Sequence, residues 1–108
     1  MNKQEQINNS IRELDLEQGQ AKTMNAIKIH QKEGEEHFKM KCKICWDLHK
    51  EDKDFLTEAY TKDRSRKFDI VDLIDCDVIE IESKLKNMKK DADKTIYIGK
   101  EKSGGFEI

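Results

Sequence analysis

Residues 67–84 contain two short apolar runs on either side of a polar turn, and this pattern constrains the fold more than any other part of the chain. The runs cover Lys67–Ile74 and Val78–Lys84, and the turn reads Asp75-Cys76-Asp77. Short runs rich in β-branched residues and separated by turn residues are typical of a β-hairpin. The pattern therefore predicts two antiparallel strands.

Before this hairpin, the period of the apolar residues changes from that of a helix to that of a strand. Residues 35–50 predict an amphipathic helix, and Phe55–Thr61 predicts a strand. Residues that share one side of the expected helix are predicted to face the core: Phe38, Cys42, Cys45, Trp46 and His49. After the hairpin, Leu85 to about Lys94 fits a basic helix, residues 95–98 fit a strand or a helix, and residues 106–108 fit a short strand.

The first 34 residues are mostly polar and predict a helical N-terminal extension to a core of residues 35–108. Ile7, Ile11 and Leu14 recur at helical spacing, and Ser10 with Glu13 resembles a capping box. Residues 21–33 carry a second, weaker helical pattern.

The composition indicates one small domain with a heavily solvated surface. The chain has 108 residues, of which 41% are charged and 35% hydrophobic, and its net charge is −2. This charge provides no global attraction to nucleic acid, so such binding would need local basic patches. A signal peptide and a membrane-spanning run are both absent, and three cysteines suit a reducing compartment, so we expect a cytoplasmic protein without membrane contact.

Acidic and basic side chains gather at one end of the predicted hairpin. Glu82 and Lys84 are two residues apart on a strand and share a face, whereas Ile79 and Ile81 point to the other face, toward the helix. A tight hairpin register would bring Asp69 near Glu82. Two carboxylates supply the hard oxygen ligands that suit Mg²⁺ or Mn²⁺, and Lys84 would orient a metal-bound water or stabilise charge on the phosphate.

This segment resembles the core of the PD-(D/E)xK nuclease superfamily, which has the restriction-endonuclease-like fold and includes Holliday junction resolvases of archaea and small viral nucleases. Asp69 lies 13 positions before Glu82, which begins the run Glu82-Ser83-Lys84. Phe68 stands where the family often has proline. The resemblance covers residues 35–98. It implies an α/β fold: a helix, a three-stranded antiparallel meander, a second helix and a further strand.

By this resemblance, Asp69 and Glu82 would be metal ligands and Lys84 the catalytic lysine. The family often adds an acidic residue from the first helix; Glu35 is preferred here over Glu36, and Glu58 on the first strand is an alternative. Arginine forks match phosphate geometry, so Arg64 and Arg66 are expected to bind the nucleic acid backbone, together with the lysines of the basic helix, Lys86 and Lys90.

A zinc site is the competing interpretation of the helix at residues 35–50. It contains Cys42 and Cys45, with His37 and His49 nearby, and these are zinc-ligating residue types. However, His37 would point away from the cysteines on a helix. Core-facing thiols are therefore the preferred interpretation, with a zinc-binding regulatory module as an alternative.

The sequence thus favours a nuclease that hydrolyses phosphodiester bonds in DNA with Mg²⁺ or Mn²⁺. A homodimer would suit substrates with two-fold symmetry, because one small unit offers little surface to a duplex. The main alternative is a non-catalytic interaction protein of a virus or mobile element, in the host cytoplasm, that uses the same fold to bind nucleic acid or a host protein.

Overall fold

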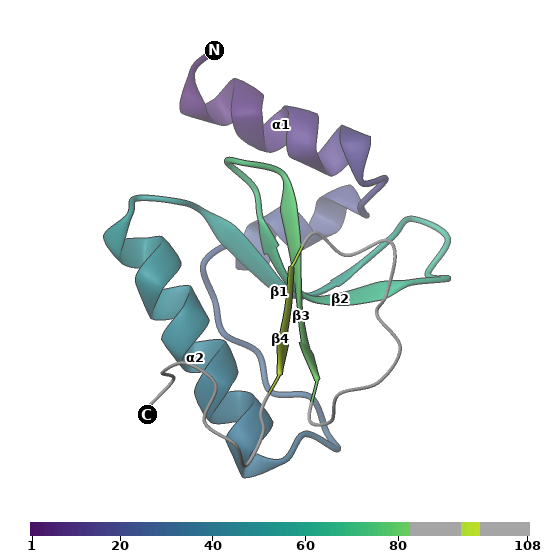
Figure 1. Ribbon diagram of the computed structural model, residues 1–108. Helices are drawn as coiled ribbons and strands as arrows, with labels where there is room; N and C mark the ends of the chain where they lie inside the picture. Colours follow the sequence, from purple (N-terminus) through teal and green to yellow (C-terminus); the bar gives the residue numbers. More distant parts are fainter. Residues whose placement is uncertain (83–93, 98–108) are drawn as a thin grey trace.

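The computed structural model describes residues 1–82 and the backbone of residues 94–97, and it places helices on both faces of a mixed β-sheet (Figure 1). In chain order the described elements are α1 (Lys3–Glu13), the 3₁₀-helix η1 (Gln18–Thr23), α2 (Glu35–Lys50), β1 (Phe55–Tyr60), β2 (Lys67–Asp72), β3 (Asp77–Glu82) and β4 (Lys94–Tyr97). The α/β class and the three-stranded antiparallel meander predicted from the sequence are confirmed.

The sheet has the strand order β1-β2-β3-β4. β2 is antiparallel to β1 and β3, whereas β4 is parallel to β3. The strand alternative for residues 95–98 is therefore confirmed, with the strand one residue earlier. The expected helix at residues 85–94 and strand at 106–108 lie outside the described residues, apart from Lys94, which begins β4.

The β2–β3 hairpin turns through residues 73–76, one residue more than the turn predicted from the sequence. Asp72 causes this difference, because its Oδ1 accepts hydrogen bonds from the backbone N–H of Ile74 (2.9 Å) and Asp75 (3.1 Å). A side chain that bonds the backbone ahead of it makes a tight turn and ends the strand. β2 therefore ends at Asp72, two residues before the predicted end.

Two hydrophobic clusters fill the two sides of the sheet. One joins α1 to the sheet and contains Ile7, Ile11, Leu16, Leu56, Ala59, Phe68, Val71, Leu73 and Val78. The other joins α2 to the sheet and contains Met40, Ile44, Cys45, Leu48, Phe55, Ile70, Ile79 and Ile81. Ile79 and Ile81 thus face the long helix, as their spacing predicted.

Helix α2 has the bounds predicted from the sequence but turns a different side to the sheet. Its buried residues are Met40, Lys41, Ile44, Cys45 and Leu48. Of the five residues expected to face the core, only Cys45 is buried; Trp46 is 57% exposed and His49 is also exposed. The prediction of this face was wrong because it followed apolar spacing, whereas acidic side chains hold the charged Lys41 inside.

Helix α1 begins earlier than its predicted cap. Asn2 and Glu5 form the capping box, in which the Asn2 side chain accepts from the Glu5 backbone N–H and the Glu5 side chain from that of Asn2. Ser10 lies inside the helix, and its buried hydroxyl donates to the Leu73 carbonyl (2.6 Å). The helical pattern at residues 21–33 extends only to the end of η1 at Thr23.

None of the helices within the described residues is long and apolar enough to span a membrane.

Replacing Ile70 by alanine is expected to lower the free energy of unfolding by about 2–5 kcal/mol. Ile70 is fully buried in the cluster beneath α2, so its truncation removes apolar contacts and leaves a cavity. The matched control is Ile29→Ala, because Ile29 is 71% exposed. Urea denaturation would measure both; equal effects of the two substitutions would contradict this description of the core.

Candidate functional site

Asp69 lies where the main-chain pairing between β2 and β3 stops. The paired positions are Ile70 with Ile79, Val71 with Val78 and Asp72 with Asp77. At the next position, a side-chain hydrogen bond replaces the main-chain pairing: Asp69 Oδ2 accepts from the Ile81 backbone N–H (2.8 Å). The carboxylate of Asp69 thus lies in an opening of the sheet.

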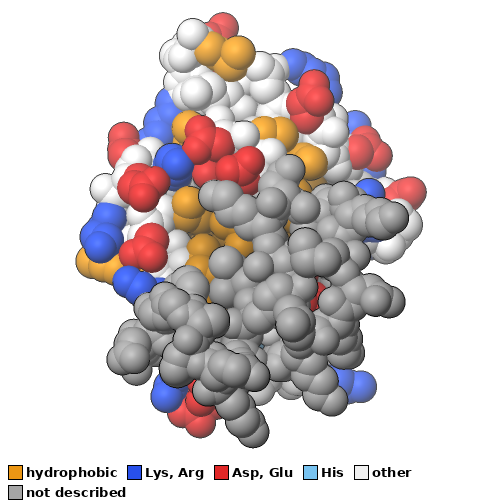
Figure 2. Space-filling model, in the orientation of Figure 1, with side chains coloured by type: hydrophobic (Ala, Val, Ile, Leu, Met, Phe, Trp, Pro, Cys, Tyr) orange, Lys and Arg blue, Asp and Glu red, His pale blue; other side chains and the backbone are white. Residues whose placement is uncertain are grey.

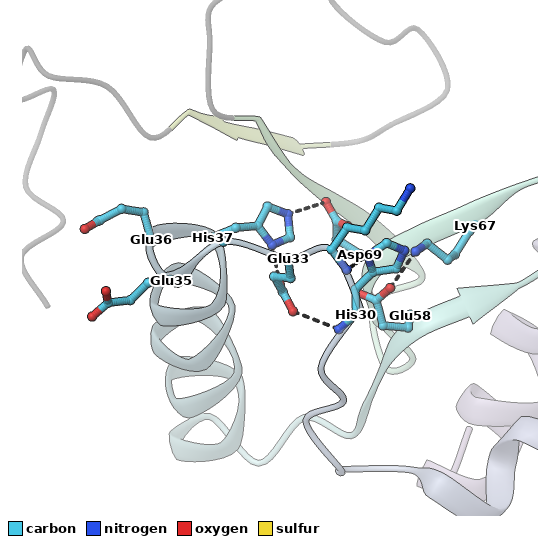
Figure 3. Close-up of a pocket in the computed structure, with 10 residues that line it drawn as sticks. His30, Glu33, Glu35, Glu36, His37, Glu58, Lys67 and Asp69 are labelled. Carbon is cyan, nitrogen blue, oxygen red and sulfur yellow. Dashed lines mark hydrogen bonds and ion pairs between the residues drawn. The ribbon is translucent and has the colours of Figure 1, made fainter.

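A cavity of about 580 Å³ adjoins this opening. Its walls are formed by the loop before α2, the first turn of α2 and the strands β1 and β2 (Figure 3). The lining residues are His30, Lys32, Glu33, Gly34, Glu35, Glu36, His37, Glu58, Lys67 and Asp69. Charged and imidazole side chains from four chain segments therefore surround one space.

His37 links the loop before α2 to Asp69. Its Nε2 lies 3.5 Å from Asp69 Oδ2, and its Nδ1 contacts the Glu33 carboxylate (Figure 3). Sequence reasoning considered His37 only as a weak zinc ligand. The i, i+4 spacing from Glu33 to His37 is the signal that could have indicated this contact.

Lys41 is a fully buried cation behind the cavity. Its Nζ donates to Glu58 Oε2 (2.8 Å), to Glu33 Oε1 (2.9 Å) and to the Lys28 carbonyl (2.7 Å). Three acceptors satisfy the three protons of the ammonium group. This network joins α2 to β1 and to the loop that leads into the helix.

Glu58 receives a second cation from β2. Its Oε1 lies 2.7 Å from Lys67 Nζ, so the two groups form a close ion pair. Lys67 is 27% exposed at its side chain and reaches the cavity from the same strand as Asp69. An ammonium group and the Asp69 carboxylate thus border the same cavity.

The pKa directions follow from this network. Burial alone would raise the pKa of Glu58, but the hydrogen bonds and charges of Lys41 and Lys67 outweigh it and hold the pKa below its usual 4.5. Glu33 behaves alike: burial is opposed by the His30 backbone N–H and Lys41, and its pKa is lowered. For Lys41, the two carboxylates outweigh desolvation and raise the pKa. All three groups are charged at neutral pH.

The structure separates the carboxylates that the sequence placed together. Glu35 is 77% exposed at its side chain and pairs with Lys39, and Figure 3 shows Glu35 and Glu36 pointing away from Asp69. Among the described residues, Asp69, Glu82 and Glu35 form no group of ligand atoms within 4.8 Å. Glu35 therefore does not join Asp69 in this structure, because the helix begins at Glu35 and turns this side chain outward.

The hairpin register also differs from the expected one. Because the turn has four residues, Glu80 rather than Glu82 comes to lie across from Asp69, and Glu80 Oε2 is 3.4 Å from the Asp69 backbone N. Glu82 is half-buried at the end of β3. Lys84, Lys86 and Lys90 lie outside the described residues.

The two arginines lie at the β1–β2 turn. The guanidinium of Arg64 donates to both carboxylate oxygens of Glu17 (3.2 Å each) and lies over the Tyr60 ring. The guanidinium of Arg66 lies over the Phe68 ring, 5.2 Å from its centre. On the face shown in Figure 2, the described acidic and basic side chains are interspersed.

Three aspartates gather at the β2–β3 turn, where Asp72, Asp75 and Asp77 have ligand atoms within 4.8 Å of one another. Lys53 already compensates this charge, since its Nζ lies 2.6 Å from Asp75 and 3.9 Å from Asp72. Asp72 Oδ1 is also occupied by the turn. Burial raises the pKa of Asp72, as expected for a structural acid.

The cysteines of α2 do not form a metal site with other described residues. No potential ligand trio within the described part of the chain contains Cys42 or Cys45. Burial raises the pKa of the Cys45 thiol to about 12, and a protonated thiol is a poor ligand. The core-facing interpretation therefore holds for Cys45, whereas Cys42 is half-buried.

Comparison with known proteins gives no match to a family model, to a curated protein or to a solved structure.

Replacing Lys41 by methionine is expected to destabilise the protein by about 3–5 kcal/mol. The substitution keeps the apolar length of the side chain but leaves the carboxylates of Glu33 and Glu58 without their shared cation. Lys43→Met is the matched control, because the ion pair of Lys43 with Asp47 is partly exposed. Urea unfolding at pH 7 would measure both, and a neutral Lys41→Met would contradict the buried network.

The same network predicts how stability depends on pH. The pKa of Glu33 and Glu58 is lower in the folded chain than the usual 4.5, so their contribution is complete above pH 4.5 and is lost as the pH falls below it. In Lys41→Met, burial is expected to raise the pKa of both carboxyls, so this variant should gain stability on going from pH 7 to pH 5. Unfolding curves across this range would test the reversal; parallel pH profiles would exclude it.

Proposed function

We propose that this protein is a metal-dependent nuclease that hydrolyses phosphodiester bonds in DNA, built on a restriction-endonuclease-like core. The observation that carries the proposal is the position of Asp69. Its carboxylate lies at the opening of the β2–β3 ladder, beside a cavity and 3.5 Å from an imidazole nitrogen. Both of these contacts use Oδ2, and Oδ1 makes no hydrogen bond or ion pair within the described residues.

The element order supports this proposal. A helix, three antiparallel strands and a fourth strand follow one another, as the resemblance to the nuclease superfamily implies. β4 pairs parallel to β3, and a parallel pair requires a crossover connection between its strands. Residues 83–93 provide the length for this connection.

The described donor set fits a divalent cation in part. Asp69 Oδ1 supplies an oxygen and His37 Nε2 a nitrogen, which suits Mn²⁺ well and Mg²⁺ less well. We therefore replace Glu35 by His37 in the proposed ligand set. Glu82 and Lys84 keep their roles from the resemblance alone, since the ligand atoms of Asp69, His37 and Glu82 do not all lie within 4.8 Å of one another. The bound ion would polarise the phosphodiester and activate a water molecule.

The lysines around the cavity have a further role in this proposal. Lys41 and Lys67 neutralise Glu33 and Glu58, so these carboxylates do not repel an approaching phosphate as strongly as free acids would. Lys67, which is partly exposed, is placed to contact the phosphate itself. Arg64 and Arg66, at the β1–β2 turn, remain the proposed contacts to the nucleic acid backbone.

A non-catalytic interaction protein is the second candidate. One observation favours it: both buried carboxylates at the cavity are held by lysines, as in a network that stabilises a fold. The mixed charges on the face in Figure 2 also offer no broad basic field among the described residues there.

Asp69→Asn is expected to reduce Mn²⁺-dependent DNA cleavage by about 100-fold or more, the scale of losing one charged group that acts on the transition state. Plasmid, single-stranded and branched DNA would be incubated with and without Mn²⁺. The matched control is Asp52→Asn, since Asp52 is exposed in the α2–β1 turn. Failure of the unchanged protein to cut any of these substrates, beside an active reference nuclease, would favour the interaction protein.

A further inference from the structure

A chain segment at residues 25–30 runs along the outer side of β1, the edge strand of the sheet. The Thr57 hydroxyl holds this segment: it accepts from the Lys28 backbone N–H (2.9 Å) and donates to the Ala26 carbonyl (2.8 Å). The Lys28 carbonyl accepts from Lys41 Nζ (2.7 Å). Apart from the Asn25 backbone N–H, which donates to the Phe55 carbonyl (2.8 Å), the segment is held to β1 through side chains rather than through a main-chain ladder.

These contacts leave a free main-chain edge on the other side of the segment. In an extended chain, the backbone groups of successive residues point to opposite sides. Since both backbone groups of Lys28 point inward, those of Ile27 and Ile29 point outward. Neither residue makes a backbone hydrogen bond within the described part of the chain. Their side chains are 39% and 71% exposed.

Lys28 adds a positive charge to this edge. Its ammonium forms no ion pair within the described residues, although its side chain is half-buried. Burial lowers the pKa of Lys28, and the charge of Lys41 lowers it further, against the attraction of Glu58. An acidic group placed opposite Lys28 would form an ion pair with this ammonium group and stabilise its charge.

We propose that residues 27–29 bind an extended peptide segment of another protein by β-strand addition, and that this segment has an acidic residue between two apolar ones. In antiparallel pairing, the outward N–H and C=O groups of Ile27 and Ile29 bond the added strand. The apolar residues of the partner lie opposite the two isoleucines. The acidic residue faces Lys28 at the non-hydrogen-bonded position, where side chains approach most closely.

A second copy of this chain fits the edge less well. Antiparallel pairing of the segment with itself would place Lys28 opposite Lys28, two half-buried like charges. So short an edge also buries much less than the roughly 1,000 Å² that a stable dimer interface needs. The basic residues that follow, His30 and Lys32, extend the preference for an acidic partner.

The test is a titration of the isotopically labelled protein with a short capped peptide of alternating threonine and valine that carries a central glutamate, followed by NMR. The backbone amide signals of Ile27 and Ile29 should shift together and saturate, and their hydrogen exchange should slow. A peptide with lysine in place of the glutamate should bind about two- to fivefold more weakly. No shift at millimolar peptide, equal binding of both peptides, or shifts elsewhere on the protein would overturn the proposal.

Ile29→Pro provides the decisive variant. It removes an N–H that the folded chain does not use, so the thermal midpoint should stay close to that of the unchanged protein while peptide binding is lost. Lys28→Ala should bind the glutamate and lysine peptides equally, whereas Lys22→Ala on η1 should behave like the unchanged protein. Normal peptide binding by a folded Ile29→Pro variant would overturn the proposal. So would a protein that, without peptide, sediments as a dimer and exchanges the amides of Ile27 and Ile29 slowly, because a second copy would then occupy the edge.

Discussion

The contact of Lys41 with Glu33 and Glu58 is the interaction on which the arrangement of this molecule depends. A charge leaves water at a large cost, and a fully buried ammonium is stable only if its protons are all bonded. Lys41 meets this condition by drawing together three separate segments: the loop before α2, the strand β1 and the segment at Lys28. The loop position then brings Glu33 to His37, and His37 to Asp69.

The backbone of β1 is strained at Glu58, one of the two acids that contact Lys41. Glu58 has a φ of 51°, in the left-handed region, although Thr57 and Ala59 on either side are paired with β2. Such a conformation costs about 1–3 kcal/mol for a residue other than glycine. We infer that the two lysines compensate this cost. Asp69 is the residue across from Glu58 in the same register, so the irregular positions of β1 and β2 coincide at the cavity.

The elements with a clear period could be predicted from the sequence, and the contacts that depend on single polar residues could not. The bounds of α2 and the inward side of Ile79 and Ile81 follow from apolar spacing. The side of α2 that packs on the sheet depends on Lys41, whose burial requires acids that are distant along the chain. The register at Asp69 depends on the hydrogen bonds that Asp72 accepts from the turn. The contact of His37 with Asp69 depends on the loop that places Glu33 beside His37. Of these contacts, only that of Glu33 with His37 has a signal in the sequence, its i, i+4 spacing.

For the cation of the proposed function, the charge balance favours Asp69 over the aspartate cluster at the hairpin turn. Beside Asp69, the carboxylates of Glu33 and Glu58 meet the ammonium groups of Lys41 and Lys67. The lysines hold Glu33 and Glu58, so Asp69 is left with an imidazole that carries charge only when protonated, and its Oδ1 makes no hydrogen bond or ion pair within the described residues. At the hairpin turn, Lys53 and the turn amides already occupy the acids. A divalent ion at Asp69 would supply charge that the described residues do not.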